Sequence, residues 1–258
     1  DRNRHFDETS GDHRRYAALT RGFTARQTLM GVLSVRTRMH VRVNAAMSVD
    51  GKLSSRERTQ VAISGPDDFD RVDALRADSD AVMVGVGTVL ADDPALTVDD
   101  ESLREARIER GEPANPARVV ADSRVRTPPE SRVLDDQADS YLLVSEAAPP
   151  DFVAQREKAG ATVISAGENR VDLAAAFEEL ADHGIDQLMV EGGGEIIYSL
   201  FEADLVDRLS VFVGSMIIGG REAPTLADGE GFVSSFPELE LETVERIDDG
   251  VVLRYHVP

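Results

Sequence analysis

The chain of 258 residues carries a formal net charge of −20, with 48 acidic residues against 28 basic ones, and it contains no cysteine. The lack of cysteine excludes a disulfide framework, a thiolate metal site and a cysteine nucleophile. The negative charge makes nucleic acids and anionic membranes poor partners, because both would repel the protein.

Lysine is unusually scarce, since Lys52 and Lys158 are the only lysines in the chain. A strongly acidic protein repels itself at low ionic strength, whereas molar salt shortens the Debye length to about 3 Å and screens the repulsion. We therefore expect a cytoplasmic protein of a halophile. An ordinary acidic protein is the alternative.

Residues 1–38 are polar, rich in arginine and weakly periodic, and they show no apolar core of a signal peptide. We expect them to form a disordered extension ahead of one folded domain over residues 39–258. No apolar run reaches the roughly 18 residues that a membrane-spanning helix needs, so no span is expected.

The folded part begins with a predicted strand and a predicted helix. Residues 40–53 alternate between apolar and polar side chains and end in an Asp-Gly turn, which is typical of a strand. Residues 64–76 predict a helix with Ser64 as its N-cap. The expected buried stripe of this helix is Phe69, Val72 and Leu75.

Strands and helices alternate along the rest of the chain. Predicted strands occupy 80–90, 116–123, 140–145, the end of 151–167, 187–190, 205–220 and 250–258, and predicted helices occupy the start of 151–167 and 171–184. This order predicts an α/β fold with a mainly parallel central sheet and helices on both faces. The last two strands are expected to form an antiparallel C-terminal end.

Two glycine-rich segments follow predicted strands. In "VEGGGEIIYSL", residues 190–200, three glycines separate a strand from a helix, and "VGVGTVLADDP", residues 84–94, is the second segment. A helix N-terminus attracts phosphate, and glycine lets a phosphate approach the backbone. Neither segment is a Rossmann fingerprint or a P-loop. Together they indicate a bound dinucleotide, and a tight structural turn is the alternative reading of the first segment.

The chain offers no pattern for metal or hydrolytic chemistry. Its five histidines are scattered, and none lies at ligand spacing from a pair of carboxylates. No G-x-S-x-G nucleophile motif is present either. The sequence therefore predicts no metal site and favours a cofactor-dependent reaction.

Five segments taken together resemble the reductase family of riboflavin biosynthesis. They are residues 44–53, 63–98, 115–128, 188–220 and 223–232. The resemblance covers residues 39–258 and implies a dihydrofolate-reductase-like fold, a homodimer, and NADPH as the cofactor with NADH as the alternative. Residues 39–258 would then be an NADPH-dependent reductase domain.

The resemblance is greatest to archaeal members, which reduce the ribosyl side chain of 2,5-diamino-6-ribosylamino-4(3H)-pyrimidinone 5′-phosphate. Bacterial members fuse this domain to a zinc deaminase, whose metal needs cysteine ligands that this chain lacks. Asn44 also stands where bacterial reductases carry lysine and archaeal ones asparagine. The implied reduction therefore precedes deamination.

The resemblance also implies roles for single residues. The implied NADPH contacts are Ala46, Thr88, Asp92, Ser123, Ile164, Gly192, Gly193, Gly194 and Glu195, the last four forming a pyrophosphate loop. The implied substrate contacts are Asn44, Arg76, Leu96 and Glu191. Arg76 would suit the 5′-phosphate, because a guanidinium forms charge-assisted hydrogen bonds with phosphate.

The implied chemistry is hydride transfer to C1′ of the opened ribosylamine, an imine that accepts hydride better when it is protonated. The sequence does not choose the assisting group among Asp50, Lys52, Asp92 and Glu191. Two other functions stay open. A pterin or folate reductase of the same fold would share the cofactor loops but not Arg76, and a non-catalytic nucleotide-binding protein would need only the glycines.

Overall fold

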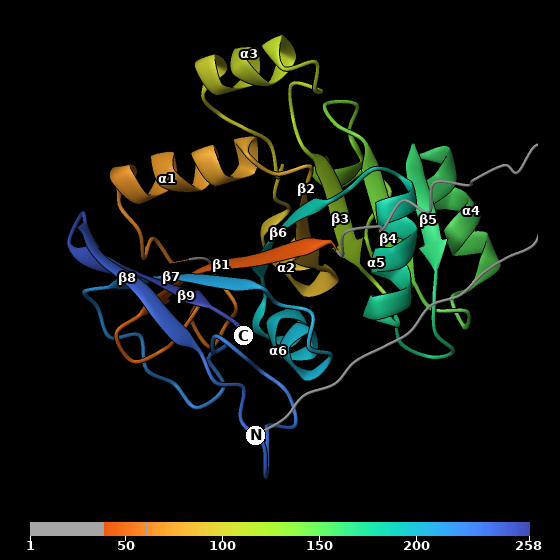
Figure 1. The fold of residues 1–258 in the computed structure, drawn as a ribbon. Coiled ribbons are helices and arrows are strands. Elements are labelled where there is room, and N and C mark those ends of the chain that lie inside the picture. The colour runs from red at the N-terminus through yellow and green to blue at the C-terminus, as the bar shows by residue number, and fades with distance from the viewer. Residues whose placement is uncertain (1–38, 60) are drawn as a thin grey trace, which may run out of the picture. The chain divides into compact units, whose positions relative to one another are not determined.

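A single sheet forms the centre of the folded part. The computed structural model describes residues 39–59 and 61–258, in which nine strands lie in the order β5-β4-β3-β2-β6-β1-β7-β9-β8 (Figure 1). Neighbouring strands are parallel from β5 to β7, whereas β9 pairs antiparallel with both β7 and β8. The predicted α/β class, mainly parallel sheet and antiparallel end are confirmed. The expected extension over residues 1–38 lies outside the described residues.

The elements have the following bounds. The strands are β1 His40–Ser48, β2 Ala81–Gly85, β3 Ala117–Ala121, β4 Ser140–Val144, β5 Ala161–Ser165, β6 Gln187–Gly192, β7 Arg208–Gly214, β8 Glu240–Ile247 and β9 Gly250–His256. The helices are α1 Pro66–Ala77, α2 Val86–Asp92, α3 Glu101–Glu109, α4 Pro150–Lys158, α5 Leu173–Asp182 and α6 Gly194–Glu202, with a 3-10 turn at Arg132–Leu134. None of these helices is long and apolar enough to cross a membrane.

Two hydrophobic cores cover the two faces of the sheet, because successive side chains of a strand point to opposite faces. Met83 of β2 packs in the core that contains α5 and α6. Its neighbour Val82 packs in the other core, to which α1, α2 and α4 contribute. The predicted placement of helices on both faces is therefore confirmed, and Figure 1 shows α1 and α6 on opposite sides of β1.

Helix α1 turns polar side chains toward the sheet. Asp68 and Asp73 are only 1% and 8% exposed, whereas Phe69 is 58% exposed. The predicted buried stripe is therefore wrong for Phe69, while Val72 and Leu75 are partly buried against the core. A helix usually buries its apolar face, so these buried carboxylates need hydrogen-bonding partners.

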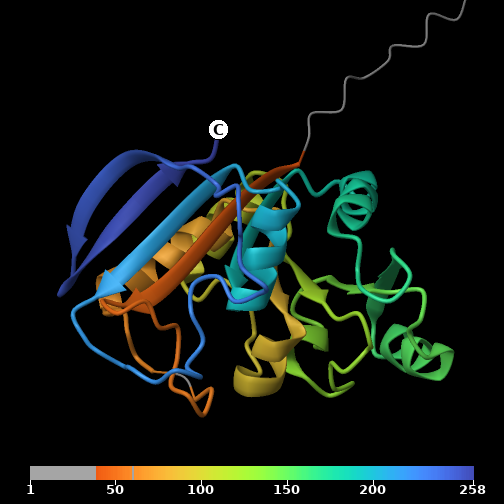
Figure 2. The same cartoon turned by 90° about the horizontal axis from the view of Figure 1, so that it is seen from below.

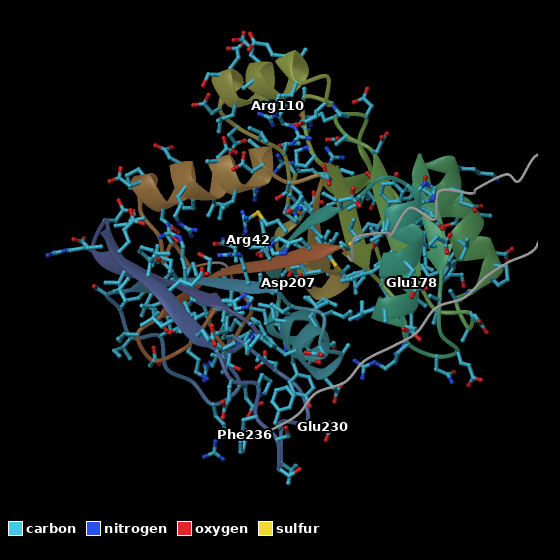
Figure 3. The ribbon with its side chains drawn as sticks, viewed as in Figure 1. Arg42, Arg110, Glu178, Asp207, Glu230 and Phe236 are labelled. Carbon is cyan, nitrogen blue, oxygen red and sulfur yellow. The ribbon has the colours of Figure 1, made fainter. Side chains whose placement is uncertain are left out.

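Strand β1 faces α1 with polar side chains. Its residues alternate, so Val41 and Val43 enter the core on the α6 side, while Arg42, Asn44 and Ala46 point toward α1. Figure 3 shows Arg42 in the layer between α1 and β1, and burial lowers the pKa of its guanidinium. A polar layer therefore separates α1 from the middle of the sheet.

The N-terminus of α1 is capped by the distant end of the chain. Asp248, in the turn between β8 and β9, accepts hydrogen bonds from the backbone N–H groups of Asp67 at 3.3 Å and Asp68 at 3.0 Å. The N-cap position is Gly65, so the prediction of Ser64 is wrong. A Cβ on Gly65 would lie 2.5 Å from Cγ of Asp248, which explains the glycine.

Three further elements differ from the prediction. Helix α2 begins directly after β2, so residues 84–94 form a strand-to-helix junction instead of a loop. Helix α3 and strand β8 were not predicted. The side chains of β8 are exposed on both faces of the strand, and such a strand needs no apolar alternation.

Candidate active site

A polar cleft of about 310 Å³ opens between α1 and the sheet. It is lined by Asn44, Ala45, Ala46, Ser64, Asp68, Phe69, Val72, Asp73, Arg76, Asp99 and Glu191. Strand β1 and the end of β6 form its floor, and α1 forms its roof. The structure thus brings together four of the predicted site residues, namely Asn44, Ala46, Arg76 and Glu191.

Arg76 and Glu191 form an ion pair inside this cleft. The Nε and Nη2 atoms of Arg76 donate to Oε1 and Oε2 of Glu191 at 2.6 and 2.8 Å, and Nη1 donates to the carbonyl of Thr97 at 2.9 Å. Burial alone would lower the pKa of Arg76, but the Glu191 carboxylate outweighs burial and raises it. Arg76 is therefore held by the protein itself, and a phosphate there would have to share the guanidinium with Glu191.

A second network joins α1 to β1 and β7. The Nε atom of Arg71 donates to Oδ1 of Asp68 at 2.8 Å, its Nη2 donates to Oδ1 of Asn44 at 3.0 Å, and its Nη1 donates to Oγ of Ser210 at 3.1 Å. Asn44 and Asp68 are 5% and 1% exposed. Arg71, Asp68 and Ser210 are site residues that the sequence analysis did not identify. The small number of apolar residues in α1 is the feature of the sequence that could have indicated a polar network there.

Asp73 fixes the segment that closes the cleft beside Arg76. Its two carboxylate oxygens accept hydrogen bonds from the backbone N–H groups of Asp99 at 2.8 Å and Asp100 at 2.7 Å. Leu96, a predicted substrate contact in the same segment, is only 1% exposed and packs in the core. Leu96 would therefore contact a ligand through its backbone, and Asp99 is the side chain of this segment that lines the cleft.

The two glycine segments meet beside the cleft. Strands β2 and β6 are parallel neighbours, with Val84 paired to Gly192, so both strand-to-helix junctions lie at one edge of the sheet. Thr88 of α2 faces Gly193, since a Cβ on Gly193 would lie 3.6 Å from Oγ1 of Thr88. The predicted contacts Thr88, Gly192, Gly193 and Gly194 are thus neighbours in space.

The three consecutive glycines have different physical reasons. Gly192 has φ +118°, which other residues rarely adopt, and the Gly192–Gly193 peptide bond is cis. A Cβ on Gly194 would lie 2.3 Å from the carbonyl oxygen of Thr225, so close packing demands glycine there. The φ angle of Gly193 is one that other residues also adopt. A Cβ there would have no atom of the described residues closer than 3.6 Å. Gly193 is therefore the position at which an external ligand best explains the glycine.

The other predicted cofactor contacts are more scattered. Asp92 and Glu195 are exposed in α2 and α6, and partial burial raises the pKa of Asp92. The Ser123 hydroxyl accepts a hydrogen bond from the backbone N–H of Val171 at 3.1 Å. The Ile164 side chain is 0% exposed in the core, and its contact with adenine stays a prediction.

Asp50 holds a loop and does not line the cleft. Its carboxylate accepts hydrogen bonds from the Ser48 hydroxyl at 2.6 Å and from the backbone N–H groups of Ile218 at 3.1 Å and Gly219 at 2.8 Å. The Ser48 hydroxyl, followed by these backbone groups, lowers the pKa of Asp50 from 3.8 to about 2. The role of Asp50 as the assisting group stays a prediction.

Lys52 also contacts a loop. Its Nζ donates to the carbonyl of Ala223 at 3.1 Å, and its backbone pairs with Thr225 in an isolated bridge. Of the four candidates for the assisting group, Glu191 is thus the one that lines the cleft. No cluster of metal-ligating side chains is found among the described residues.

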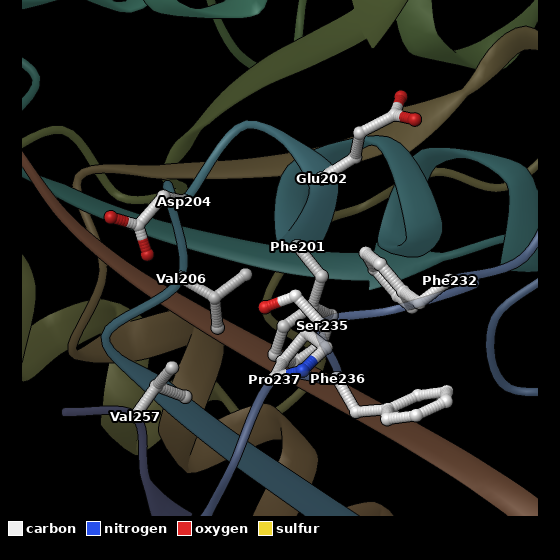
Figure 4. A pocket seen from close by; sticks show the side chains of 9 residues that line it. All are labelled: Phe201, Glu202, Asp204, Val206, Phe232, Ser235, Phe236, Pro237 and Val257. Atoms are coloured by element: carbon white, nitrogen blue, oxygen red, sulfur yellow. The ribbon is translucent and has the colours of Figure 1, made fainter.

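A second hollow of about 350 Å³ lies elsewhere (Figure 4). It is lined by Phe201, Glu202, Asp204, Val206, Phe232, Ser235, Phe236, Pro237 and Val257. Its walls are mostly apolar, and none of the predicted site residues lies in it. The cleft beneath α1 is therefore the candidate active site, because its polar side chains converge beside the glycine junctions.

The chain belongs to the RibD C-terminal domain family, whose model matches residues 39–253. It is 48% identical over 213 residues to the 2,5-diamino-6-ribosylamino-4(3H)-pyrimidinone 5′-phosphate reductase of Archaeoglobus fulgidus, an alignment that covers 83% of this chain and 95% of the relative. It is 44% identical over 222 residues to the protein of the same name from Methanothermobacter thermautotrophicus, covering 85% and 99% of the two chains. The resemblance stated from the sequence is confirmed.

The fold is shared with solved structures. A pyrimidine reductase-like protein from Corynebacterium diphtheriae matches with a TM-score of 0.75 at 20% sequence identity, over 85% of this chain and 92% of that one. At this level of identity the match supports the architecture of the domain.

Proposed function

We propose that this protein is the reductase that converts the ribosyl side chain of 2,5-diamino-6-ribosylamino-4(3H)-pyrimidinone 5′-phosphate into the ribityl chain, in riboflavin biosynthesis. The observation that carries the proposal is the position of the polar cleft, which is lined by Glu191, directly before the glycines that face Thr88. A substrate in the cleft would thus lie next to a bound dinucleotide. The archaeal relatives bear this activity in their names.

NADPH fits the edge of the sheet at which β2 and β6 lead into α2 and α6. Gly193 has no side chain to prevent a close approach to the backbone, and α6 begins directly after it, so the first turn of α6 would face a phosphate there. Thr88 and the glycines would hold the pyrophosphate, and Ala46 would leave room on β1 for the nicotinamide. When bound, NADPH supplies the hydride for the reaction. NADH is the alternative donor.

Glu191 is the side chain of the cleft that would lie beside the reacting carbon and assist the reaction. The substrate opens to an imine at C1′, and a carboxylate stabilises the positive charge of the protonated imine. The bidentate pair with Arg76 fixes the orientation of this carboxylate. Arg76 would then position Glu191, and it would also contact the 5′-phosphate if the phosphate binds at the α1 side of the cleft.

Substrate turnover tests the proposal against the other functions. We expect NADPH oxidation with the pyrimidinone phosphate and none with dihydrofolate. Turnover of dihydrofolate alone would indicate a pterin or folate reductase, and NADPH binding without oxidation of either substrate would indicate a nucleotide-binding protein. A parallel assay with NADH compares the two cofactors.

The Arg76→Ala variant separates the two roles of Arg76. A lost phosphate contact should raise the KM of the phosphorylated substrate about 10- to 150-fold, since charge-assisted hydrogen bonds contribute roughly 1.5–3 kcal/mol. The KM of the dephosphorylated analogue should then stay unchanged, whereas kcat should fall with both compounds because Glu191 loses its partner. An equal rise of KM with both compounds would remove Arg76 from the phosphate site and leave it the role of orienting Glu191.

We also propose a homodimer, as the family resemblance implies. The outer strand β8 leaves one edge of its backbone unpaired in the described part of the chain, and Leu241 and Val244 on it are 55% and 62% exposed. An exposed edge strand with apolar side chains favours pairing with another chain. Sedimentation analysis should give twice the mass of one chain, and a monomer at micromolar concentration would contradict the dimer.

A further inference from the structure

The segment between α2 and α3 has an irregular backbone that neighbouring side chains bind closely. Residues 93–100 form neither helix nor strand. The amide oxygen of Asn115 accepts a hydrogen bond from the backbone N–H of Val98 at 3.1 Å, and the Asp73 carboxylate accepts from the next two N–H groups. Buried backbone groups outside regular structure need such partners. Side chains of neighbouring elements therefore set the shape of this segment.

The backbone of Leu96 indicates that this shape serves a purpose. Its φ is +54°, in the left-handed region that residues other than glycine seldom adopt, although its side chain is buried. A strained backbone of this kind persists only where the surrounding structure holds it, and such strain is concentrated at functional sites. The contacts of the residues that follow Leu96 therefore show what the segment does.

One of these contacts fixes Arg76. The carbonyl oxygen of Thr97 accepts from Nη1 of Arg76 at 2.9 Å, while Nε and Nη2 donate to Glu191 at 2.6 and 2.8 Å. A guanidinium is a planar, rigid fork, so an acceptor fixed at Nη1 sets the direction in which Nε and Nη2 point. The position of the Thr97 carbonyl therefore determines where the Glu191 carboxylate is held.

We propose that Asp73 is a positioning residue for Glu191, acting through the Thr97 carbonyl and Arg76. The inference rests on the proposed function, because it takes Glu191 as the side chain that assists the reaction. Within the described residues Asp73 makes no hydrogen bond to Arg76 or Glu191, so it acts through the backbone that it binds. Asp73 and Arg76 are three residues apart on one face of α1, and the helix thus holds the segment at two points.

The Nε–H group of Arg76 reports on this arrangement without turnover. In the wild type its NMR signal should exchange slowly with water, because Glu191 binds this N–H and the two side chains are only 19% and 16% exposed. Asp73→Ala removes both acceptors of the segment, and the exchange should become at least about tenfold faster, as the loss of a hydrogen bond to a charged group allows.

A purely local role of Asp73 predicts a different result. The backbone N–H groups of Asp99 and Asp100 would then exchange faster in Asp73→Ala, because they lose their acceptor. The Nε–H signal of Arg76 would exchange as in the wild type, and this result would overturn the proposal.

The Asn115→Ala variant separates position from charge. Burial lowers the pKa of Arg76, whereas Glu191 and, to a smaller extent, Asp73 raise it, so Asp73→Ala also changes the charge near the guanidinium. Asn115→Ala releases Val98 without a change of charge, and it should speed the exchange of the Arg76 signal by about 2- to 10-fold. Wild-type exchange in Asn115→Ala would overturn the proposal, and this variant decides alone if Asp73→Ala does not fold.

The Asp80→Ala variant is the matched control. The Asp80 carboxylate also accepts from two consecutive backbone N–H groups, those of Asp186 and Gln187 at 2.9 and 2.8 Å, and none of these three residues lines the cleft. Asp80→Ala should lower the melting temperature as Asp73→Ala does, but it should leave the Arg76 signal unchanged. A change of that signal in Asp80→Ala would reflect general destabilisation and would overturn the proposal.

Turnover extends the test to the reaction. In Asp73→Ala, kcat with the pyrimidinone phosphate should fall about tenfold, because a small displacement of an assisting group slows the reaction, while the KM for NADPH stays constant. In the Arg76→Ala background the same substitution should have little further effect on kcat, and additive losses would overturn the proposal. Failure of the proposed function is seen separately. The wild type would then not oxidise NADPH with this substrate, while the Arg76 signal would still respond to Asp73→Ala.

Discussion

Gly193 and Gly194 are neighbours whose substitution should have opposite consequences. A Cβ on Gly193 meets only Oγ1 of Thr88, at an ordinary 3.6 Å, so Gly193→Ala should fold normally. Its added methyl group would occupy the space proposed for the pyrophosphate, and we expect the KM for NADPH to rise about 10-fold or more. Steady-state kinetics at saturating substrate measures this change.

Gly194→Ala is the matched comparison. Its Cβ would lie 2.3 Å from the backbone oxygen of Thr225, so the loop must shift. Overpacking of this kind costs about 1–3 kcal/mol of unfolding free energy. The melting temperature should therefore fall for Gly194→Ala and stay constant for Gly193→Ala. An unchanged KM for NADPH in folded Gly193→Ala would show that the glycine serves the turn alone.

The Asp50 carboxylate should make stability depend on pH in acid. Its pKa is about 2 in the folded protein and near 3.8 otherwise, so its contribution is present above about pH 4 and is lost as the pH falls toward 2. Asp50→Asn removes the carboxylate. The difference in melting temperature between wild type and variant should therefore shrink as the pH is lowered through this window. A difference that stays constant would contradict the assignment.

The cap of α1 carries the next prediction, at the level of whole elements. Asp248→Ala removes the acceptor for the first backbone N–H groups of α1, which should cost about 1 kcal/mol of stability. The KM for the pyrimidinone phosphate should rise too, because α1 forms the roof of the cleft. Thermal melting and steady-state kinetics measure the two effects. Asp249→Ala is the control, since within the described part of the chain Asp249 is bound through its backbone carbonyl, by the Ser215 hydroxyl.

Most strands and helices could be predicted because the residues that determine each of them lie close together in the sequence. The alternation in β1 and the apolar runs of β2, β4 and β6 are visible in the sequence, and Gly160 and Gly184 mark the ends of α4 and α5. Helix α3 and strand β8 could not be found in this way. Both lie at the surface with few buried side chains, so no apolar pattern marks them.

The cleft could be predicted only in part. Glu191 and Arg76 were recognisable from the family's motifs, but the pairing between them joins residues 115 positions apart. The Arg71 network needs β1, β7 and α1 to be in place, and the cap of α1 comes from Asp248. Contacts of this kind depend on the assembled sheet, and local periodicity contains no information about them.

The charge of the whole molecule leads to a prediction about salt. With a net charge of −20, repulsion among surface carboxylates opposes folding until salt screens it. We expect the melting temperature to rise when KCl increases from about 0.1 M to about 1 M, where the Debye length falls from roughly 10 to 3 Å. Neutralising the exposed acids Glu178 and Glu179 as glutamines should reduce this rise. A melting temperature that falls with salt would contradict a halophilic protein.

The position of β1 has a consequence for biosynthesis. This first strand is flanked by β6 and β7, as Figure 2 shows for β7, and the partners therefore leave the ribosome more than a hundred residues later. Until then both backbone edges of β1 stay unpaired in the nascent chain. Unpaired strand edges promote aggregation, so chaperone binding should matter most during this period. Because Asp248 lies 180 positions after Asp68, the cap of α1 forms only after β8 has left the ribosome. Truncated chains should therefore accumulate as inactive, aggregation-prone species instead of as weak enzymes.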